Sequence, residues 1–560
     1  MKTTCIKGQL LSLISLFFIS AIQAAEFKEG NIFYRTLSDD EVAVIAPTDY
    51  SFTYSGSIVL PESITHEGTE YRVTTIAQQA FFMAEITSIT IPNSVTEIQQ
   101  YAFAACRELS SITLPEGLSK ITYRAFSQCI KLTEIALPES VTEIEDFAFR
   151  DCTGLTAIAL GNQVTRIGNN AFYNCTTLQQ FTVVEGNPVY ASVDGILFDK
   201  AKTTLLAYPN AKGATYAIPD EVIAIGPGAF QGCSGLTSIT LGKGIASLGS
   251  NPFASCSSLQ EILVDAANAH YTSVDGVLFD KSQEILIQYP LSRSGFYEIP
   301  LGVTTIGDYA FCNCTKLSNI TIPESVTTLG ESAFAGCAKL STATLPDAVT
   351  SVGNSAFKQC SNLCRVTFGA NLQTIGNTAF SSTPILSLTI PDQVTSIGEH
   401  AFSYCPYLTD IVLGRSLQEI GQSAFAWSQS IRQIKCCSFY PPVCGVNCFD
   451  GVSVDRCFLT VPSNAYDYYK ADPTWSRFDL QGSGAPTAID QPEANPVSIH
   501  ATGHSIVISN LPADTDVTIY NLAGQMVQSI RPTTQNVEIE LPAGILYIVR
   551  TGDRTQKVKL

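Results

Sequence analysis

The amino-acid sequence predicts a mostly β repeat solenoid, with coils of about 23 residues, followed by a small C-terminal β-sandwich. The first observation is a landmark, Ala-Phe or a close variant, that recurs along the chain and is usually followed three residues after the Phe by Cys. A fixed period in the range of 20 to 50 residues is typical of solenoids, whose coils bury their apolar faces against each other. The second observation is that this period ends near residue 496, where short alternating strands begin. The landmark phenylalanines are Phe81, Phe103, Phe126, Phe149, Phe172, Phe230, Phe253, Phe311, Phe334, Phe357, Phe380, Phe402, Phe425 and Phe449.

Within one coil, the apolar residues Ile112 and Leu114 stand one residue apart, which predicts a short strand with one buried face. Pro115 ends that strand, because proline cannot donate a ladder hydrogen bond. A second extended piece carries Leu118 and Ile121, and residues 123–129 are expected to close the coil as a tight helical turn. The spacing Leu-x-x-Ile-x-Leu is that of leucine-rich repeats. We expect fourteen such coils, plus whatever the two longer steps add, with parallel strands ~4.8 Å apart.

The coil Cys-x-x-Leu-x-x-Ile-x-Leu-Pro-x-x-Val-x-x-Ile-x-x-x-Ala-Phe resembles the BspA-like leucine-rich repeat family of bacterial surface proteins. Residues 318–334 are a near-consensus copy, and the resemblance covers roughly residues 60–480. It implies an exported protein, and some members of that family bind host matrix proteins or mediate adhesion.

Six segments make up the expected domain organisation. Residues 1–24 are a secretory signal peptide, with Lys2 and Lys7 before an apolar run and small residues at its end. Residues 25–75 form an N-terminal cap, 76–435 the solenoid, 436–481 its C-terminal cap, 482–496 a linker and 497–560 the β-sandwich; hairpin-bearing insertions lie near 184–219 and 265–300. No later stretch approaches 18 apolar residues, so no transmembrane span is expected. The cell surface or the extracellular space is therefore the expected location, with the outer membrane as one site of association.

The C-terminal segment has seven expected short strands and a second resemblance. Residues 517–527, 541–544 and 547–550, together with the alternating basic end at 557–560, resemble the C-terminal sorting domain of type IX secretion substrates. Two residues, Ile545 and Leu546, separate Gly544 from Tyr547 where that family usually has one. The resemblance implies a sorting role, and an accessory β-sandwich is the alternative.

The two longer steps of the repeat are copies of each other, with corresponding residues 81 apart. Asp-Gly pairs at 194–195 and 275–276 lie between alternating apolar residues and predict hairpins. A calcium loop with Asp194 and Asp199 is the alternative, but too few acidic ligands lie nearby. Tyr190, Tyr208, Tyr271 and Tyr289 are the insertion aromatics that could contact a glycan if their rings are exposed.

Seventeen of the 18 cysteines follow the signal peptide. Ten occupy the position three after the Phe, and equivalent atoms on stacked coils are spaced more widely than the ~3.8 Å between Cβ atoms of a disulfide. We therefore expect a ladder of buried thiols rather than disulfides or metal ligands. One or two bridges are expected instead among Cys436, Cys437, Cys444, Cys448 and Cys457, where the repeat decays.

Charge and motifs exclude several function classes. The formal net charge is −18, which disfavours nucleic acid as a partner. The five histidines, which include His500 and His504 four residues apart, have no metal-ligand spacing with Cys, Asp or Glu. Phosphate-binding, hydrolase and metalloprotease motifs are also missing. No catalytic residue, cofactor or metal is therefore predicted, and the protein is expected to be non-enzymatic.

The outward position of the predicted strands is mostly threonine, for example Thr321, Thr344, Thr367 and Thr389. Solenoids bind extended partners on their strand face, so this stripe is the candidate binding face. Threonine also forms exposed strands well, and a purely structural role is the competing interpretation. We expect a secreted or surface-displayed scaffold that binds or adheres to a protein ligand, either a host matrix protein or another bacterial surface protein. The alternatives are a glycan-binding surface protein and a spacer that displays its terminal domain.

Overall fold

The computed structural model describes residues 24–48 and 53–482, and within the C-terminal part residues 498–502, 505–509, 515–521, 525–532, 537–542, 546–551 and 554–559. The expected signal peptide lies outside the described residues except for Ala24, and so does the expected linker except for Gly482. The chain divides into two compact units, Met1–Gly482 and Ser483–Leu560.

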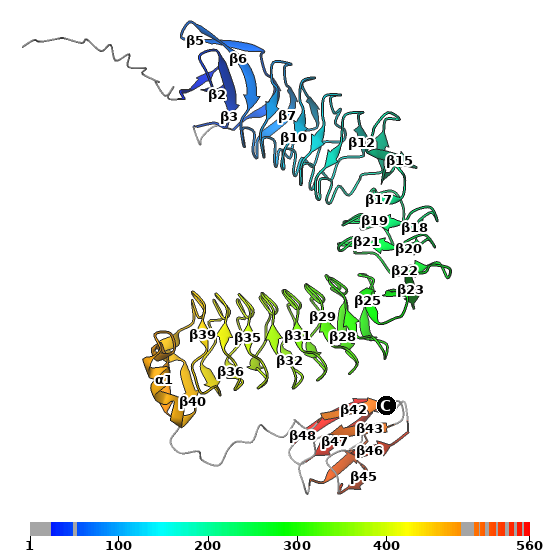
Figure 1. Ribbon diagram of the computed structural model, residues 1–560, viewed down its shortest axis with the longest axis vertical. Coiled ribbons are helices and arrows are strands. Elements are labelled where there is room, and N and C mark those ends of the chain that lie inside the picture. Colours follow the sequence, from blue (N-terminus) through cyan, green and yellow to red (C-terminus); the bar gives the residue numbers. More distant parts are fainter. Residues whose placement is uncertain are drawn as a thin grey trace, which may run out of the picture. The chain divides into compact units, whose positions relative to one another are not determined.

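The first unit is a solenoid in which most coils contribute a strand to a first parallel ladder (Figure 1). The strand is short because proline or a turn follows its two inward-facing apolar residues. Its members are β4 (Ser55–Val59), β7 (Glu85–Thr90), β9 (Ser111–Thr113), β12 (Ala157–Leu160), β14 (Gln180–Val183), β18 (Thr215–Ala217), β20 (Ser238–Leu241), β22 (Glu261–Val264), β26 (Gly295–Glu298), β28 (Leu317–Thr321), β30 (Thr342–Thr344), β32 (Arg365–Thr367), β34 (Ser387–Thr389), β36 (Asp410–Leu413), β38 (Gln433–Cys436), β40 (Phe458–Val461) and β41 (Asp479–Gly482).

A second parallel ladder contains the second extended piece of each coil, which is usually only two residues long. Its members are β6 (Thr69–Ile76), β8 (Glu97–Ile98), β10 (Lys120–Ile121), β11 (Glu143–Ile144), β13 (Arg166–Ile167), β17 (Thr204–Ala207), β19 (Ala224–Ile225), β21 (Ser247–Leu248), β25 (Ile285–Gln288), β27 (Thr305–Ile306), β29 (Thr328–Leu329), β31 (Ser351–Val352), β33 (Thr374–Ile375), β35 (Ser396–Ile397), β37 (Glu419–Ile420) and β39 (Val443–Cys444).

The landmark phenylalanines stack along the interior of the solenoid. Phe334 is completely buried, and its ring centroid lies 4.8 Å from that of Phe311 and 5.0 Å from that of Phe357. The backbone N–H of Phe334 donates to the carbonyl of Ala356 in the next coil, at 2.7 Å. Thirteen of the fourteen landmark phenylalanines are buried, as the repeat pattern predicts.

The segments around these phenylalanines differ from the helical turns that the sequence led us to expect. They are successive β-turns, because residues two before and two after the Phe adopt left-handed backbone angles. In one coil these residues are Tyr101, with φ 58°, and Ala105, with φ 60°. A helix cannot continue through residues in the left-handed region. In the part of the chain that the structure describes, the α-helical residues are confined to α1 (Tyr466–Ala471).

Both insertions contain the predicted hairpins. In the first, β15 (Tyr190–Val193) pairs with β16 (Ile196–Asp199), and Asp194 and Gly195 both have positive φ. In the second, β23 (Tyr271–Val274) pairs with β24 (Val277–Asp280) in the same way. Positive φ at both central residues is the geometry of a type I′ turn.

Each insertion also adds a complete coil, which the landmark did not reveal because a tyrosine replaces its phenylalanine. The ring of Tyr208 lies 5.2 Å from that of Phe230, and its N–H donates to the carbonyl of Ala229. Tyr289 packs in the same way on Phe311, at 5.0 Å. With these coils and the capped ends, the solenoid has about 18 turns.

The two ends of the solenoid are covered. At the start, β1 (Glu26–Glu29), β2 (Ile32–Thr36), β3 (Glu41–Ile45) and β5 (Ser63–His66) join β6 in one sheet. At the other end, η1 (Val454–Arg456), η2 (Ser463–Ala465), α1 and η3 (Trp475–Arg477) surround the last strands. Trp475 is completely buried and lies 5.6 Å from Phe449, the last landmark ring.

The second unit contains two antiparallel sheets and a small core of its own (Figure 1). One sheet consists of β42 (Ser498–Thr502), β43 (Ser505–Ser509) and β46 (Val537–Glu540). The other consists of β44 (Val517–Tyr520), β45 (Met526–Ile530), β47 (Leu546–Thr551) and β48 (Arg554–Lys559). Buried residues from both sheets, such as Ile506 and Ile519, belong to the same core. This arrangement is a β-sandwich.

Candidate binding surface

The outward face of the first ladder carries the predicted threonine stripe. Thr321, Thr344, Thr367 and Thr389 are all exposed on β28, β30, β32 and β34. The residue before each of them is buried, because side chains alternate between the two faces of a strand. Thr344 and Thr367 are direct partners in the parallel register. The structure therefore brings these four side chains together in one column on consecutive coils.

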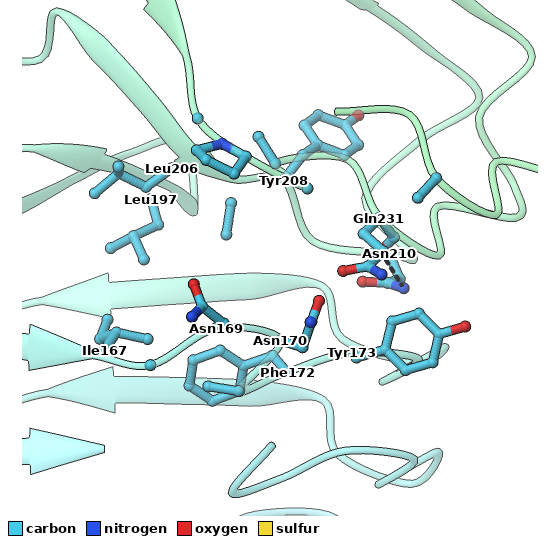
Figure 2. Close-up of a pocket in the computed structure, with 18 of the residues that line it drawn as sticks. Ile167, Asn169, Asn170, Phe172, Tyr173, Leu197, Leu206, Tyr208, Asn210 and Gln231 are labelled. Atoms are coloured by element: carbon cyan, nitrogen blue, oxygen red, sulfur yellow. Dashed lines mark hydrogen bonds between the residues drawn. The ribbon is translucent and has the colours of Figure 1, made fainter. Parts of the chain in front are cut away.

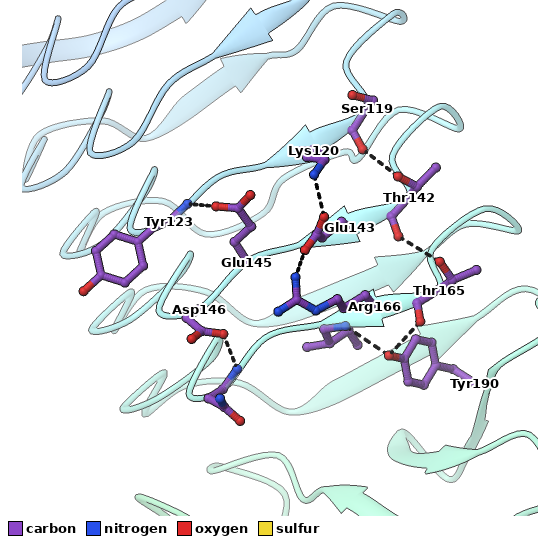
Figure 3. Close-up of polar contacts among 12 residues, drawn as sticks. Ser119, Lys120, Tyr123, Thr142, Glu143, Glu145, Asp146, Thr165, Arg166 and Tyr190 are labelled. Atoms are coloured by element: carbon purple, nitrogen blue, oxygen red, sulfur yellow. Dashed lines mark hydrogen bonds and ion pairs between the residues drawn. The ribbon is translucent and has the colours of Figure 1, made fainter.

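The face of the second ladder differs at β10, β11 and β13, where three charged side chains are paired with one another (Figure 3). Lys120 Nζ lies 2.8 Å from Glu143 Oε2, and Arg166 contacts the other oxygen of the same carboxylate. The hydrogen bond from Lys120 lowers the pKa of Glu143, and the charges of Lys120 and Arg166 act in the same direction. This ladder of charges joins three successive coils, and we assign it a role in holding them together.

The insertion tyrosines do not form the exposed aromatic platform that a glycan-binding surface would need. Tyr190, Tyr208 and Tyr289 are buried and Tyr271 is partly buried. The rings of Tyr208 and Tyr289 belong to the interior stack. The hydroxyl of Tyr190 accepts a hydrogen bond from the N–H of Ile167 at 3.0 Å, so its ring is tied to the preceding coil.

Asp199, which the calcium alternative required, has a structural role in the first insertion. One carboxylate oxygen accepts hydrogen bonds from the N–H groups of Thr203 and Thr204, at 2.7 and 2.8 Å. The other accepts from the Thr203 hydroxyl. Among the residues that the structure describes, no group of three or more His, Cys, Asp or Glu is placed to hold a metal ion.

The ladder cysteines are free and buried, and they make a contact that the sequence did not indicate. Each thiol donates to the backbone carbonyl of the stacked aromatic residue in the preceding coil; for example, Cys152 Sγ lies 3.0 Å from the oxygen of Phe126. The acceptor is a phenylalanine for eight thiols, and it is Tyr208 for Cys233 and Tyr289 for Cys314. Ser428 occupies the same coil position and makes the same bond to Phe402, at 2.8 Å. Burial raises the pKa of Cys152 to about 12, so its thiol is protonated at neutral pH and can donate.

The five cysteines near the C-terminal cap are also free, so the expected bridges among them are absent from the structure. Cys436 is held instead by hydroxyl groups, with Tyr469 OH at 3.1 Å and Ser438 Oγ at 3.5 Å from its sulfur. The pKa of the Cys444 thiol is raised by its hydrogen bond with Cys448 and by burial.

Sequence reasoning missed a group of exposed aromatic side chains near the C-terminal end of the solenoid. Tyr404 and Trp427 are exposed, nearly parallel, and 6.5 Å apart. Both have left-handed φ, at a coil position that elsewhere holds residues such as Gln128 and Gly336. An aromatic residue at a position that favours small or amide side chains is the signal that could have found them. Phe439, Tyr440 and Tyr468 form a second exposed group.

The repeats match a known family of leucine-rich repeat proteins. The model of the BspA type leucine rich repeat region matches residues 74–191, 207–294, 293–409 and 395–467, which is more than half of the chain. The chain belongs to the BspA-type leucine-rich repeat family. No match is found among the curated proteins.

Several solved structures resemble this BspA-type repeat protein. A leucine rich cell surface protein from Faecalibacterium prausnitzii is 26% identical, with 74% of this chain and 94% of that chain covered and a TM-score of 0.38. A leucine-rich repeat protein from Bacteroides ovatus is also 26% identical, with 73% and 94% covered and a TM-score of 0.34. The pneumococcal vaccine antigen PcpA is 19% identical, with 82% and 97% covered and a TM-score of 0.34.

The α-helix of the BspA-type repeat protein, α1, is six residues long. Among its described residues, no helix is both long enough and apolar enough to cross a bilayer.

Proposed function

We propose that this BspA-type protein is an exported, surface-displayed and non-enzymatic scaffold that binds a protein ligand. The observation that carries the proposal is the column of exposed threonines at 321, 344, 367 and 389. It is continuous across consecutive coils and bears no charge of its own. An extended polypeptide can lie across such a face and contact methyl and hydroxyl groups in turn. The ligand is either a host matrix protein or another bacterial surface protein.

The two other functions considered above have less support. A glycan-binding platform on the insertion tyrosines would need exposed rings, and three of these four rings are buried. A spacer would bind nothing through its repeats, so any saturable ligand on the threonine column argues against it.

The test is a binding assay with purified protein spanning residues 25–560 against immobilised matrix proteins and bacterial surface proteins. Thr344→Arg with Thr367→Arg places two long cations on the column. The matched control is Thr328→Arg with Thr374→Arg, which changes two exposed threonines of the second ladder. We expect the first pair to weaken capture at least about tenfold and the control to leave it unchanged. Equal effects of the two pairs, or no captured protein at all, would refute the proposal.

A further inference from the structure

The first insertion leaves a cavity in the wall of the solenoid (Figure 2). The second ladder is interrupted here, because β13 is the last strand of one sheet and β17 pairs only with β16 and β19. A cavity of about 450 Å³ lies between residues 167–173 on one side and residues 206–210 on the other. Its volume falls in the range of ~300–1,000 Å³ that small-molecule sites occupy.

The lining of this cavity is polar but uncharged. It contains no Asp, Glu, Lys, Arg or His, although 82 of the 560 residues are Asp, Glu, Lys or Arg. Side-chain amides and partly exposed aromatic rings take their place, among them Asn169, Asn170, Gln231, Phe172 and Tyr173. Within the described part of the chain, the side-chain amides of Asn169, Asn170 and Gln231 make no hydrogen bond to another protein group. They are therefore available to a ligand.

The second insertion provides an internal comparison, because its residues correspond to those of the first at a distance of 81. Gln288 stands where the first insertion has Ala207, and its side chain donates to the carbonyls of Tyr289 and Ala310, at 2.9 and 3.3 Å. Leu291 replaces Asn210, and Ala254 replaces Tyr173.

The landmark phenylalanines beside the two insertions also differ in their exposure. Phe253, which precedes the second insertion, is completely buried, whereas its counterpart Phe172 is partly exposed. Of the fourteen landmark phenylalanines, all of them described, Phe172 alone is not buried. Residues that line the cavity of the first insertion thus differ from their counterparts in the second, and the exposure of Phe172 differs with them.

We propose that this cavity binds an uncharged oligosaccharide. An amide both donates and accepts, so it can pair with adjacent sugar hydroxyls, and an aromatic ring can cover the apolar C–H face of a sugar. A phosphorylated, sulfated or acidic sugar would bring a charge into a site whose lining contains no cation. The proposal is separate from the protein ligand proposed for the threonine column.

The test starts with purified protein, residues 25–560, on an array of neutral and anionic glycans, followed by calorimetric titration with the best neutral ligand. Ala207→Gln with Asn210→Leu copies the second insertion into the first and should close the cavity without unfolding the coil. Asn170→Gly removes an amide at a left-handed position, φ 55°, which glycine accepts readily. Each change should weaken binding at least about tenfold.

The matched control is Asn447→Gly, because Asn447 has the same coil position and φ 57° but lies outside the cavity. It should leave the affinity unchanged, as should the arginine pair at 344 and 367, and thermal unfolding should show that each variant is folded. The proposal fails if no neutral glycan binds, if anionic glycans are preferred, or if the closing variant binds as well as the parent.

Discussion

Phe334, a representative landmark phenylalanine, makes hydrogen bonds to the next coil through its backbone in addition to filling the interior. The N–H of Phe334 donates to Ala356, and its carbonyl accepts from the thiol of Cys360 at 3.1 Å. The same ring stacks on both neighbours, so one residue joins three coils. The Ala-Phe and Cys positions are thus coupled by one hydrogen-bond pattern as well as by packing.

Phe334→Ala should therefore be strongly destabilising. The loss of a completely buried ring leaves a cavity, and we expect a cost of about 3–5 kcal/mol in the free energy of unfolding. Urea denaturation measures it. Phe296→Ala, at a ring that is 56% exposed, is the control and should cost well under half as much. Similar losses for the two variants would contradict the assignment of Phe334 to the core.

The ladder thiols predict a loss of stability at alkaline pH. Burial raises the pKa of Cys106, Cys152 and Cys256 from 9.0 to about 12, so the folded state favours the protonated thiol. The buried protonated thiols therefore contribute to the free energy of unfolding in full below pH 9. That contribution is lost as the pH rises toward 12, by about 1.4 kcal/mol per pH unit for each thiol. Urea midpoints measured between pH 8 and pH 11 should fall accordingly. Replacing these three cysteines by serine, the residue found at 428, should flatten the decline; an unchanged slope would show that the thiols are not its cause.

At the scale of elements, the hairpin of the first insertion depends on close backbone approach. Gly195 has φ 75°, and a Cβ built on it would lie 2.8 Å from the Cβ of Gln180 on β14. Gly195→Ala should therefore cost about 1–2 kcal/mol of backbone strain, and the steric clash with Gln180 should add to this cost. Gly30 has φ 60° and open space around its Cβ position, so Gly30→Ala should cost the strain alone. Thermal denaturation should rank Gly195→Ala as clearly less stable, and the reverse order would contradict the docked hairpin.

Periodicity predicted the strands and the buried phenylalanines, and the two Asp-Gly pairs predicted the hairpins, because each feature depends on residues close together in the chain. It did not predict the form of the turns, since left-handed backbone angles occur there at residues as different as Tyr101 and Asn447. The additional coils were missed because tyrosine substitutes for phenylalanine at 208 and 289. The cavity beside Phe172 arises from packing between segments about 40 residues apart, which a single coil pattern does not contain.

At the scale of the whole molecule, the two compact units have separate cores, so each should fold without the other. If residues 497–560 act as a type IX sorting domain, a chain ending at residue 482 should form a folded solenoid that stays in the periplasm. Surface labelling and cell fractionation measure this distribution. Equal surface amounts of the truncated and full chains would instead indicate an accessory β-sandwich.

On the proposed function, a protein ligand lies on the threonine column of the first ladder. Site-specific photo-crosslinking tests it directly, with a benzophenone amino acid placed at Thr344 or Thr367 and, for comparison, at Thr328 or Thr374. In the presence of the captured protein, we predict crosslinked complexes from positions 344 and 367 and none from positions 328 and 374. Crosslinks from the second ladder alone would contradict the claim.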